Sequence, residues 1–108
     1  MSESQTWQRL FDRIIGSWMS RAIYAAAKLR IADHLAAGPR SARELAAAAG
    51  VAPGPLYRLL RALASIGIFD RQPDGRFRLN ATAELLREEG ADSKWAMAVM
   101  LGEEQDRC

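Results

Sequence analysis

One stretch decides the fold of this chain: Ser41-Ala-Arg-Glu-Leu-Ala-Ala-Ala-Ala-Gly-Val-Ala-Pro-Gly-Pro-Leu-Tyr-Arg-Leu-Leu-Arg-Ala-Leu-Ala-Ser-Ile-Gly-Ile-Phe69. Ser41 and Glu44 have the spacing of a capping box, which predicts a helix over residues 42–49 that ends at Gly50. After the short turn of residues 51–54, Pro55 fits the first turn of a second helix, which ends at Gly67. Its apolar residues share one face: Leu56, Leu59, Leu60, Leu63 and Ile66.

A β-hairpin is predicted directly after this pair of helices. Residues 68–70 form the first strand, Pro73-Asp74-Gly75 has turn chemistry, and residues 76–79 alternate polar and apolar as a returning strand. Helix, turn, helix and a two-stranded ribbon make a winged helix-turn-helix, so we expect a mainly α fold with a two-stranded β-wing. This fold hosts both DNA-binding proteins and assembly modules.

The N-terminal segment carries an apolar stripe at helical spacing. It predicts helical structure over residues 7–27, either as one helix or as two helices that separate at Gly16-Ser17, because a mid-helix glycine costs about 1 kcal/mol. Such a stripe fits a core, but its width and its N-terminal place also fit a surface between chains. The candidate dimer interface comprises Trp7, Leu10, Phe11, Ile14, Trp18 and Ala22.

The helices that flank the winged unit complete the expected organisation. We expect a short helix over residues 31–37, a helix capped by Asn80 or Thr82 that holds Leu85 and Leu86, and a terminal helix from Ser93 to about Glu104. Residues 95–101 are apolar around the whole helix, which requires a partner chain or a further domain to bury them. The chain thus divides into an N-terminal helical dimerisation segment (1–30), a winged helix-turn-helix (31–80) and C-terminal connecting helices (81–108).

Length and composition indicate one globular domain. The 108 residues are 49% hydrophobic and 26% charged. The single cysteine, Cys108, excludes an internal disulfide and a cysteine-based metal cluster. The N-terminus is polar and the longest apolar run has seven residues, too few for a signal peptide or a membrane span. We therefore expect a cytoplasmic protein.

No catalytic, cofactor-binding or metal-binding residues are predicted. No two glycines are separated by a single residue, so the chain has no G-x-G nucleotide loop. His34 stands alone in a short apolar helix and is interpreted as structural. The acidic pairs at 88–89 and 103–104 are interpreted as solvated.

The charge distribution raises the question of nucleic-acid binding. Residues 1–80 carry twelve Lys/Arg and six Asp/Glu, whereas residues 81–108 carry three and seven. However, the second helix begins with Ala52-Pro-Gly-Pro55, which offers no side-chain hydrogen bond to a base edge. Five arginines could touch phosphates, which predicts weak, salt-sensitive association at most: Arg58, Arg61, Arg71, Arg76 and Arg78.

Four segments together resemble the N-terminal dimerisation domain of S-adenosylmethionine-dependent small-molecule O-methyltransferases. They follow the family's order and spacing over about residues 8–104: residues 17–38, residues 56–69, Gly75-Arg-Phe-Arg-Leu79 and Met100-Leu-Gly-Glu-Glu104. The resemblance implies a homodimer. It also implies that S-adenosylmethionine and the catalytic base belong to a following Rossmann-type domain, so this chain alone is expected to bind no cofactor.

The resemblance also gives the terminal helix a role. In the family the connecting helix lines one wall of the acceptor pocket, and the matching positions are Met97, Met100 and Leu101. Since the chain ends at Cys108, we expect a fragment, a truncated product or a free-standing module. The main hypothesis is a non-catalytic dimerisation module; the alternatives are a small winged-helix DNA-binding regulator and an enzyme that works with a separately encoded catalytic chain.

Overall fold

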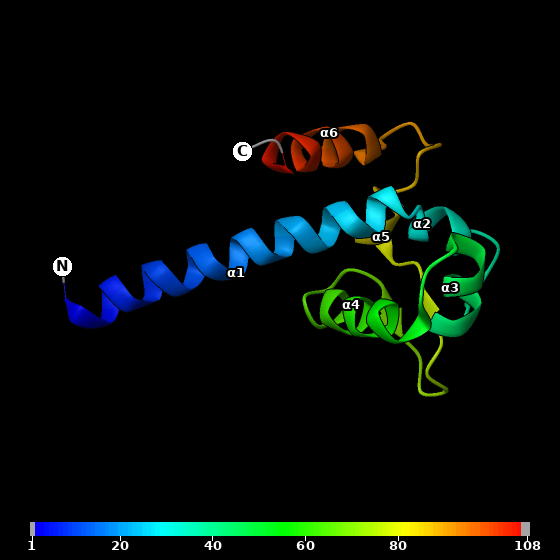
Figure 1. The fold of residues 1–108 in the computed structure, drawn as a ribbon, viewed down its shortest axis with the longest axis horizontal. Helices are drawn as coiled ribbons and strands as arrows, with labels where there is room; N and C mark the ends of the chain where they lie inside the picture. Colours follow the sequence, from blue (N-terminus) through cyan, green and yellow to red (C-terminus); the bar gives the residue numbers. More distant parts are fainter. Residues whose placement is uncertain (1, 107–108) are drawn as a thin grey trace.

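One long helix and a group of shorter elements make up the structure, a computed structural model that describes residues 2–106 (Figure 1). The N-terminal part of the long helix, α1, projects away from the body, and the last helix, α6, lies beside its C-terminal part (Figure 1). Cys108 lies outside the described residues. In chain order the elements are α1 (Glu3–Lys28), α2 (Ile31–His34), α3 (Ala42–Ala49), α4 (Pro53–Ser65), β1 (Asp70–Arg71), β2 (Phe77–Arg78), α5 (Ala81–Glu84) and α6 (Trp95–Asp106).

The helix-turn-helix is confirmed, with one correction at the start of α4. The capping box is formed: the Glu44 N–H donates to Ser41 Oγ at 3.1 Å, and the Ser41 N–H donates to Glu44 Oε1 at 3.0 Å. Gly50 ends α3 in the left-handed region at φ 73°. α4 begins at Pro53, two residues before the predicted Pro55, with extended Ala52 as its N-cap. Pro53 suits this first position because it lacks the N–H that a helix start leaves without an intrahelical partner.

The core lies between α4, the C-terminal end of α1, and the wing. Leu56, Leu60 and Leu63 of α4 are buried as predicted, while Leu59 and Ile66 pack against the core from its margin. The largest fully buried side chains of the described residues come from five different parts of the chain: Phe69, Phe77, Ile31, Leu35, Leu45, Leu60 and Leu63. A single continuous core therefore unites the winged unit with the base of α1.

The wing is present but shorter than predicted. β1 and β2 pair antiparallel, with Asp70 opposite Arg78 and Arg71 opposite Phe77. Ile68 and Phe69 were predicted to start the first strand, but both are buried in the core and Phe69 adopts φ 70°, which interrupts an extended backbone. A bridge between Arg40 and Phe77, absent from the sequence-based prediction, ties the segment before α3 to the wing.

α1 is one continuous helix, so the structure has the first of the two alternatives and no break at Gly16-Ser17. A single glycine costs only about 1 kcal/mol in a helix interior, and a capping box at Ser2 together with unbroken backbone hydrogen bonding outweighs it. The last two turns of α1 are buried through small residues, Ala22, Ala26 and Ala27. These alanines let α1 approach its neighbours closely.

The remaining helices are shorter or shifted relative to the prediction. α2 ends at His34 instead of residue 37, and turns continue to Gly38 at φ 144°. Asn80 caps α5 by accepting the Ala83 N–H at 2.8 Å, but α5 ends at Glu84, so Leu85 and Leu86 follow it. The terminal helix was predicted to run from Ser93; it begins two residues later, at Trp95, and the Ser93 hydroxyl accepts the Trp95 N–H at 3.2 Å.

Candidate functional site

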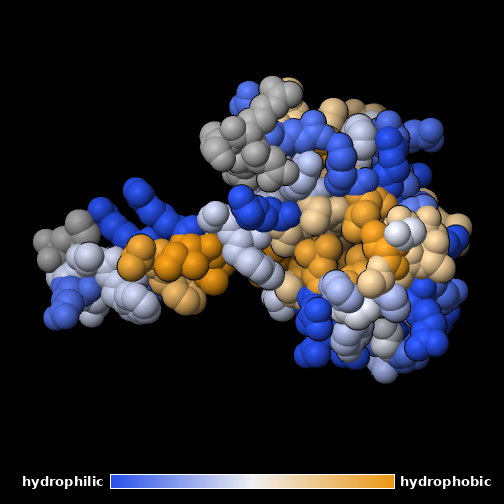
Figure 2. Space-filling model, in the orientation of Figure 1, coloured by the Kyte–Doolittle hydropathy of each residue, from blue (hydrophilic) through white to orange (hydrophobic). Residues whose placement is uncertain are grey.

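The projecting part of α1 carries an exposed apolar stripe. Five large side chains that share one face of the helix are each between 44% and 62% exposed, although they belong to residue types that normally lie inside: Trp7, Leu10, Phe11, Ile14 and Trp18. Figure 2 shows apolar atoms gathered along this part of the helix. A patch of this kind marks an interaction surface more often than a solvated face.

The sixth predicted interface residue, Ala22, has a different environment. It is only 6% exposed and belongs to the core cluster of the chain itself. The stripe therefore changes role along α1: its first three turns face outward, and its last turns build the core. We use the name α1 stripe below for the five exposed residues from Trp7 to Trp18.

A second apolar surface lies on α6. Trp95, Ala98, Val99 and Gly102 are partly or fully covered, whereas Met97, Met100 and Leu101 are 50–60% exposed. The expectation that the chain provides no neighbour for this helix is therefore half wrong, because α1 covers one face. The predicted pocket-wall residues share the other, open face.

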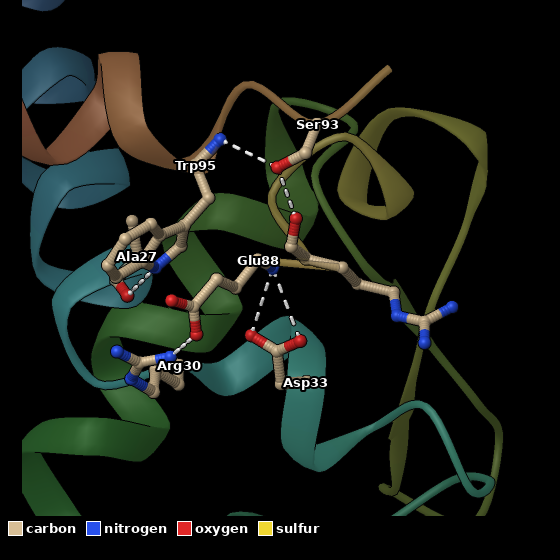
Figure 3. A network of polar contacts seen from close by, with 7 residues as sticks. Ala27, Arg30, Asp33, Glu88, Ser93 and Trp95 are labelled. Atoms are coloured by element: carbon tan, nitrogen blue, oxygen red, sulfur yellow. Dashed lines mark hydrogen bonds and ion pairs between the residues drawn. The ribbon is translucent and has the colours of Figure 1, made fainter. Parts of the chain in front are cut away.

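A polar network fixes the start of α6 beside the end of α1 (Figure 3). The indole N–H of Trp95 donates to the Ala27 carbonyl at 2.8 Å. The Arg30 guanidinium lies 4.6 Å from the centre of the same indole ring and forms an ion pair with Glu88. Both carboxylate oxygens of Asp33 accept the Glu88 N–H at 3.2 Å. These contacts connect α1, α2 and the segment before α6.

The network also explains a strained backbone position and adds a contact that the sequence did not predict. Arg30 adopts φ 57°, a conformation that costs a non-glycine residue about 1–3 kcal/mol. Its contacts with Trp95 and Glu88 help to hold it there. Glu88 is exposed, as predicted, and it also joins the acidic loop to Arg30 and to Asp33 of α2. Sequence patterns missed this pairing because its partners lie more than fifty positions apart.

Farther along, α6 and α1 approach each other very closely. A Cβ added to Gly102 would lie 2.0 Å from Cδ1 and 2.6 Å from Cβ of Tyr24, so this contact requires glycine. Lys28 of α1 forms an ion pair with Glu103, another acid that was predicted to be solvated. The hydrogen bond to Glu103, together with its negative charge, raises the pKa of Lys28 above its usual range. α6 is thus held along its length.

The described residues contain no group of three or more His, Cys, Asp or Glu side chains that could hold a metal ion. His34 is half-buried at the end of α2. Within the same part of the chain, no helix is both long and apolar enough to cross a membrane.

In a DNA-binding winged helix, the start of the second helix contacts the base edges. In this chain that start is apolar. Residues 52–55 are exposed but offer no side-chain donor or acceptor. On the wing, Arg76 pairs with Asp74 at 2.8 Å and Arg78 with Asp70 at 3.4 Å. Arg71 donates to the Tyr57 hydroxyl at 3.1 Å. The carboxylates of Asp74 and Asp70 offset part of the positive charge on the wing, whereas the neutral Tyr57 hydroxyl leaves the charge of Arg71 unchanged.

An apolar groove lies beside the start of α4. It has a volume of about 230 Å³ and is lined by six residues from the end of α1, the turn after α3 and the start of α4: Leu29, Val51, Ala52, Pro55, Leu56 and Leu59. None of these side chains carries a polar atom, so the groove favours an apolar occupant over a polar ligand. Sequence reasoning did not find it, since its lining comes from three separate segments.

Comparison with known proteins gives a consistent family assignment. The family model described as the O-methyltransferase dimerisation domain matches residues 11–89. The phenazine O-methyltransferase PhzM of Lysobacter antibioticus is 44% identical over 99 residues, which cover 92% of this chain and 29% of that protein. The 8-amino-8-demethylriboflavin N,N-dimethyltransferase of Streptomyces davaonensis is 38% identical, over 89% of this chain and 28% of its own length.

Solved structures agree with these relatives. The crystal structure of LaPhzM superposes with a TM-score of 0.87 at 42% identity, covering 94% of this chain and 31% of that one. The O-methyltransferase NcsB1 from neocarzinostatin biosynthesis, solved with S-adenosylmethionine and 2-hydroxy-5-methyl naphthoic acid, gives 0.74 at 40% identity, over 82% and 28%. The chain therefore spans less than a third of the proteins that it resembles.

Proposed function

The chain belongs to the O-methyltransferase dimerisation domain family, and from this premise we propose that it joins two copies of itself through the α1 stripe. The observation that carries the proposal is the exposure of five large apolar side chains on a helix that projects from the body. The alternative of a DNA-binding regulator has no comparable support, because the start of α4 is apolar and two of the three wing arginines, Arg76 and Arg78, form ion pairs.

The energy of such an interface is estimated from the exposed side chains. Full burial of a large apolar side chain contributes roughly 1.5–3 kcal/mol, and the α1 stripe is already about half covered. Five such residues on each of two chains thus contribute about 8–15 kcal/mol, against an association cost of about 4–15 kcal/mol. The burial energy is sufficient for a dimer when the whole exposed surface of the stripe is buried. It is marginal when only one edge of the stripe is buried.

The experiment measures assembly by sedimentation velocity across micromolar concentrations. We expect a dimer for the unaltered chain and a monomer for Trp18→Asp, which places a charge within the apolar stripe, at the end nearest the body. Arg9→Gln is the matched control, because it lowers the net charge by the same amount and lies on roughly the opposite side of α1 at about 100° per residue. An unaltered chain that stays monomeric, or a Trp18→Asp variant that still dimerises, refutes the proposal.

We further propose that the open face of α6 meets a catalytic methyltransferase domain. Met97, Met100 and Leu101 would line one wall of the acceptor pocket there, and flexible methionine side chains suit a flat aromatic surface. S-adenosylmethionine would bind to that domain, whether it continues the chain or is a separate chain, and the assembly would work in the cytoplasm. The matched relatives include both an O-methyltransferase and an N,N-dimethyltransferase. Residues outside this module would therefore determine whether oxygen or nitrogen accepts the methyl group.

A further inference from the structure

The five arginines that the sequence places on α4 and the wing fall into two groups in the structure. Arg76 and Arg78 form ion pairs with aspartates of the wing. The other three are exposed, and no carboxylate of the described residues forms an ion pair with them: Arg58, Arg61 and Arg71. The positive charge of this side of the molecule is therefore concentrated in the second group.

Tyr57 brings two of these three guanidinium groups together, and the helix adds the third. Cζ of Arg61 lies 5.6 Å from the centre of the Tyr57 ring and Cζ of Arg71 lies 5.8 Å from it. Arg71 also donates to the Tyr57 hydroxyl at 3.1 Å. Arg58 precedes Arg61 by three residues on α4, so the two side chains are neighbours on the helix surface. The ring packs edge-on against buried Phe77, which keeps this arrangement in place.

A hollow of about 310 Å³ adjoins two of the arginines. It is lined by Arg58, Arg61, Ala62 and Ser65, on the side of α4 that faces away from its buried leucines. The Ser65 hydroxyl donates to the Ala62 carbonyl at 2.6 Å. The side-chain donors that remain available at the hollow are therefore the guanidinium N–H groups.

We propose that Arg58, Arg61 and Arg71 form a binding site for a small phosphoryl anion, a phosphate monoester or a diphosphate. Neighbouring guanidinium groups without carboxylate partners repel one another, and a bound anion removes this repulsion. Each guanidinium is a planar fork of donors that matches two oxygens of a phosphate. A phosphate monoester offers three oxygens and nearly two negative charges at neutral pH, whereas a carboxylate offers two oxygens and one charge. The phosphoryl group therefore satisfies more of the donors.

The compactness of the patch favours a small ligand over a nucleic-acid backbone. Duplex DNA carries one charge per roughly 1.7 Å of its axis, so a protein that binds its backbone needs positive charge along an extended surface. On the wing side the patch is bounded by the carboxylates of Asp70 and Asp74. At the other end, the start of α4 offers no side-chain donor. The site uses neither the α1 stripe nor the open face of α6, so it is independent of the proposed dimer.

The test is a titration with inorganic pyrophosphate at low salt, followed by NMR of the arginine Nε–H signals. We expect the signals of the three arginines to shift saturably, with a dissociation constant of about 1 mM or lower. Exposed arginines elsewhere, Arg13 of α1 and Arg43 of α3, serve as internal controls. Sodium chloride at matched ionic strength should not reproduce the shifts. Equal shifts at all arginines, or the same shifts with chloride, show only charge screening and overturn the proposal.

Variants then distinguish a built site from a merely positive surface. Arg61→Lys keeps the charge but loses the planar fork, so we expect about fivefold weaker binding or more, and Arg58→Gln with Arg61→Gln weakens it at least about tenfold. Arg43→Gln is the matched control and changes it less than about twofold. All three positions are exposed, and circular dichroism checks that the helices are retained. Undiminished binding by Arg61→Lys refutes the site.

A DNA duplex of about 20 base pairs supplies the second comparison. We expect pyrophosphate to shift the arginine signals at a lower total phosphate concentration than the duplex does. A duplex that acts at the lower concentration assigns the patch to nucleic acid and overturns the proposal. Because the α1 stripe is unaltered in every variant, failure of this site leaves the proposed dimer standing.

Discussion

Replacing Gly102 with alanine tests how α6 is held against α1. The added methyl carbon would lie 2.0, 2.2 and 2.6 Å from Cδ1, Cγ and Cβ of Tyr24, where ordinary contacts begin near 3.4 Å. The Tyr24 atoms involved lie near its backbone, so a rotation of the ring alone does not remove the clash. The two helices must separate by about 1 Å or more, which breaks the interdigitated packing.

The size of the effect follows from two opposing contributions. Overpacking of a close contact costs about 1–3 kcal/mol, which shifts the docking equilibrium of α6 by roughly 5- to 150-fold. Alanine also favours the helical state over glycine by about 1 kcal/mol. We therefore expect α6 to stay helical but to dock more weakly, so that the Trp95 indole loses its hydrogen bond to the Ala27 carbonyl.

The assay combines circular dichroism, Trp95 fluorescence in a background with Trp7 and Trp18 changed to phenylalanine, and hydrogen exchange over residues 98–102. Weaker docking is seen as unchanged helical content, red-shifted emission and faster exchange. Gly16→Ala is the matched control: a Cβ there meets nothing within 4 Å, and we expect stabilisation by about 0.5–1 kcal/mol. A Gly102→Ala chain that gains stability like Gly16→Ala, with unaltered exchange, refutes the reasoning.

Three further outcomes are expected. Trp95→Phe keeps a ring under Arg30 but removes the donor to the Ala27 carbonyl, so thermal unfolding shows a loss of about 0.5–1.5 kcal/mol; an unchanged melting temperature contradicts the contact. The hydrogen bond from the Ser41 N–H holds the pKa of Glu44 below its usual range, so the stability lost in Glu44→Gln at neutral pH vanishes as the pH falls through the lowered pKa; urea titrations across this range check the sign. Met97→Glu combined with Met100→Glu raises solubility without changing the oligomeric state, because the open face of α6 lies outside the α1 stripe. Light scattering measures both properties, and loss of the dimer contradicts the separation of the two surfaces.

Local chemistry made much of the fold predictable. The capping box at Ser41 and Glu44 and the left-handed Gly50 fix the bounds of α3 within ten residues of sequence, and the structure matches them. Asn80 likewise caps α5 as one of the two predicted alternatives. Each of these signals depends on residues within one helical turn, where spacing alone determines which atoms meet.

Contacts between distant segments were not predictable in the same way. Gly102 has no local signature that distinguishes it from Gly16, yet one touches Tyr24 and the other meets nothing. Glu88 stands in an acidic run, and its partner Arg30 becomes visible only when α6 lies beside α1. The candidate site shares this division: helical spacing predicted the α1 stripe, but the groove needed three segments to be brought together.

The composition of the turn before α4 connects these observations. In a DNA-binding winged helix the start of the second helix requires polar side chains that reach base edges. Here Val51, Ala52 and Pro55 occupy that place and form an apolar groove instead. An apolar surface at this position is costly to leave in water, and the same chain carries a projecting helix whose exposed side chains are also apolar. The proposed pairing through the α1 stripe accounts for the exposed side chains of that helix, whereas the apolar start of α4 offers no side-chain hydrogen bond to a base edge.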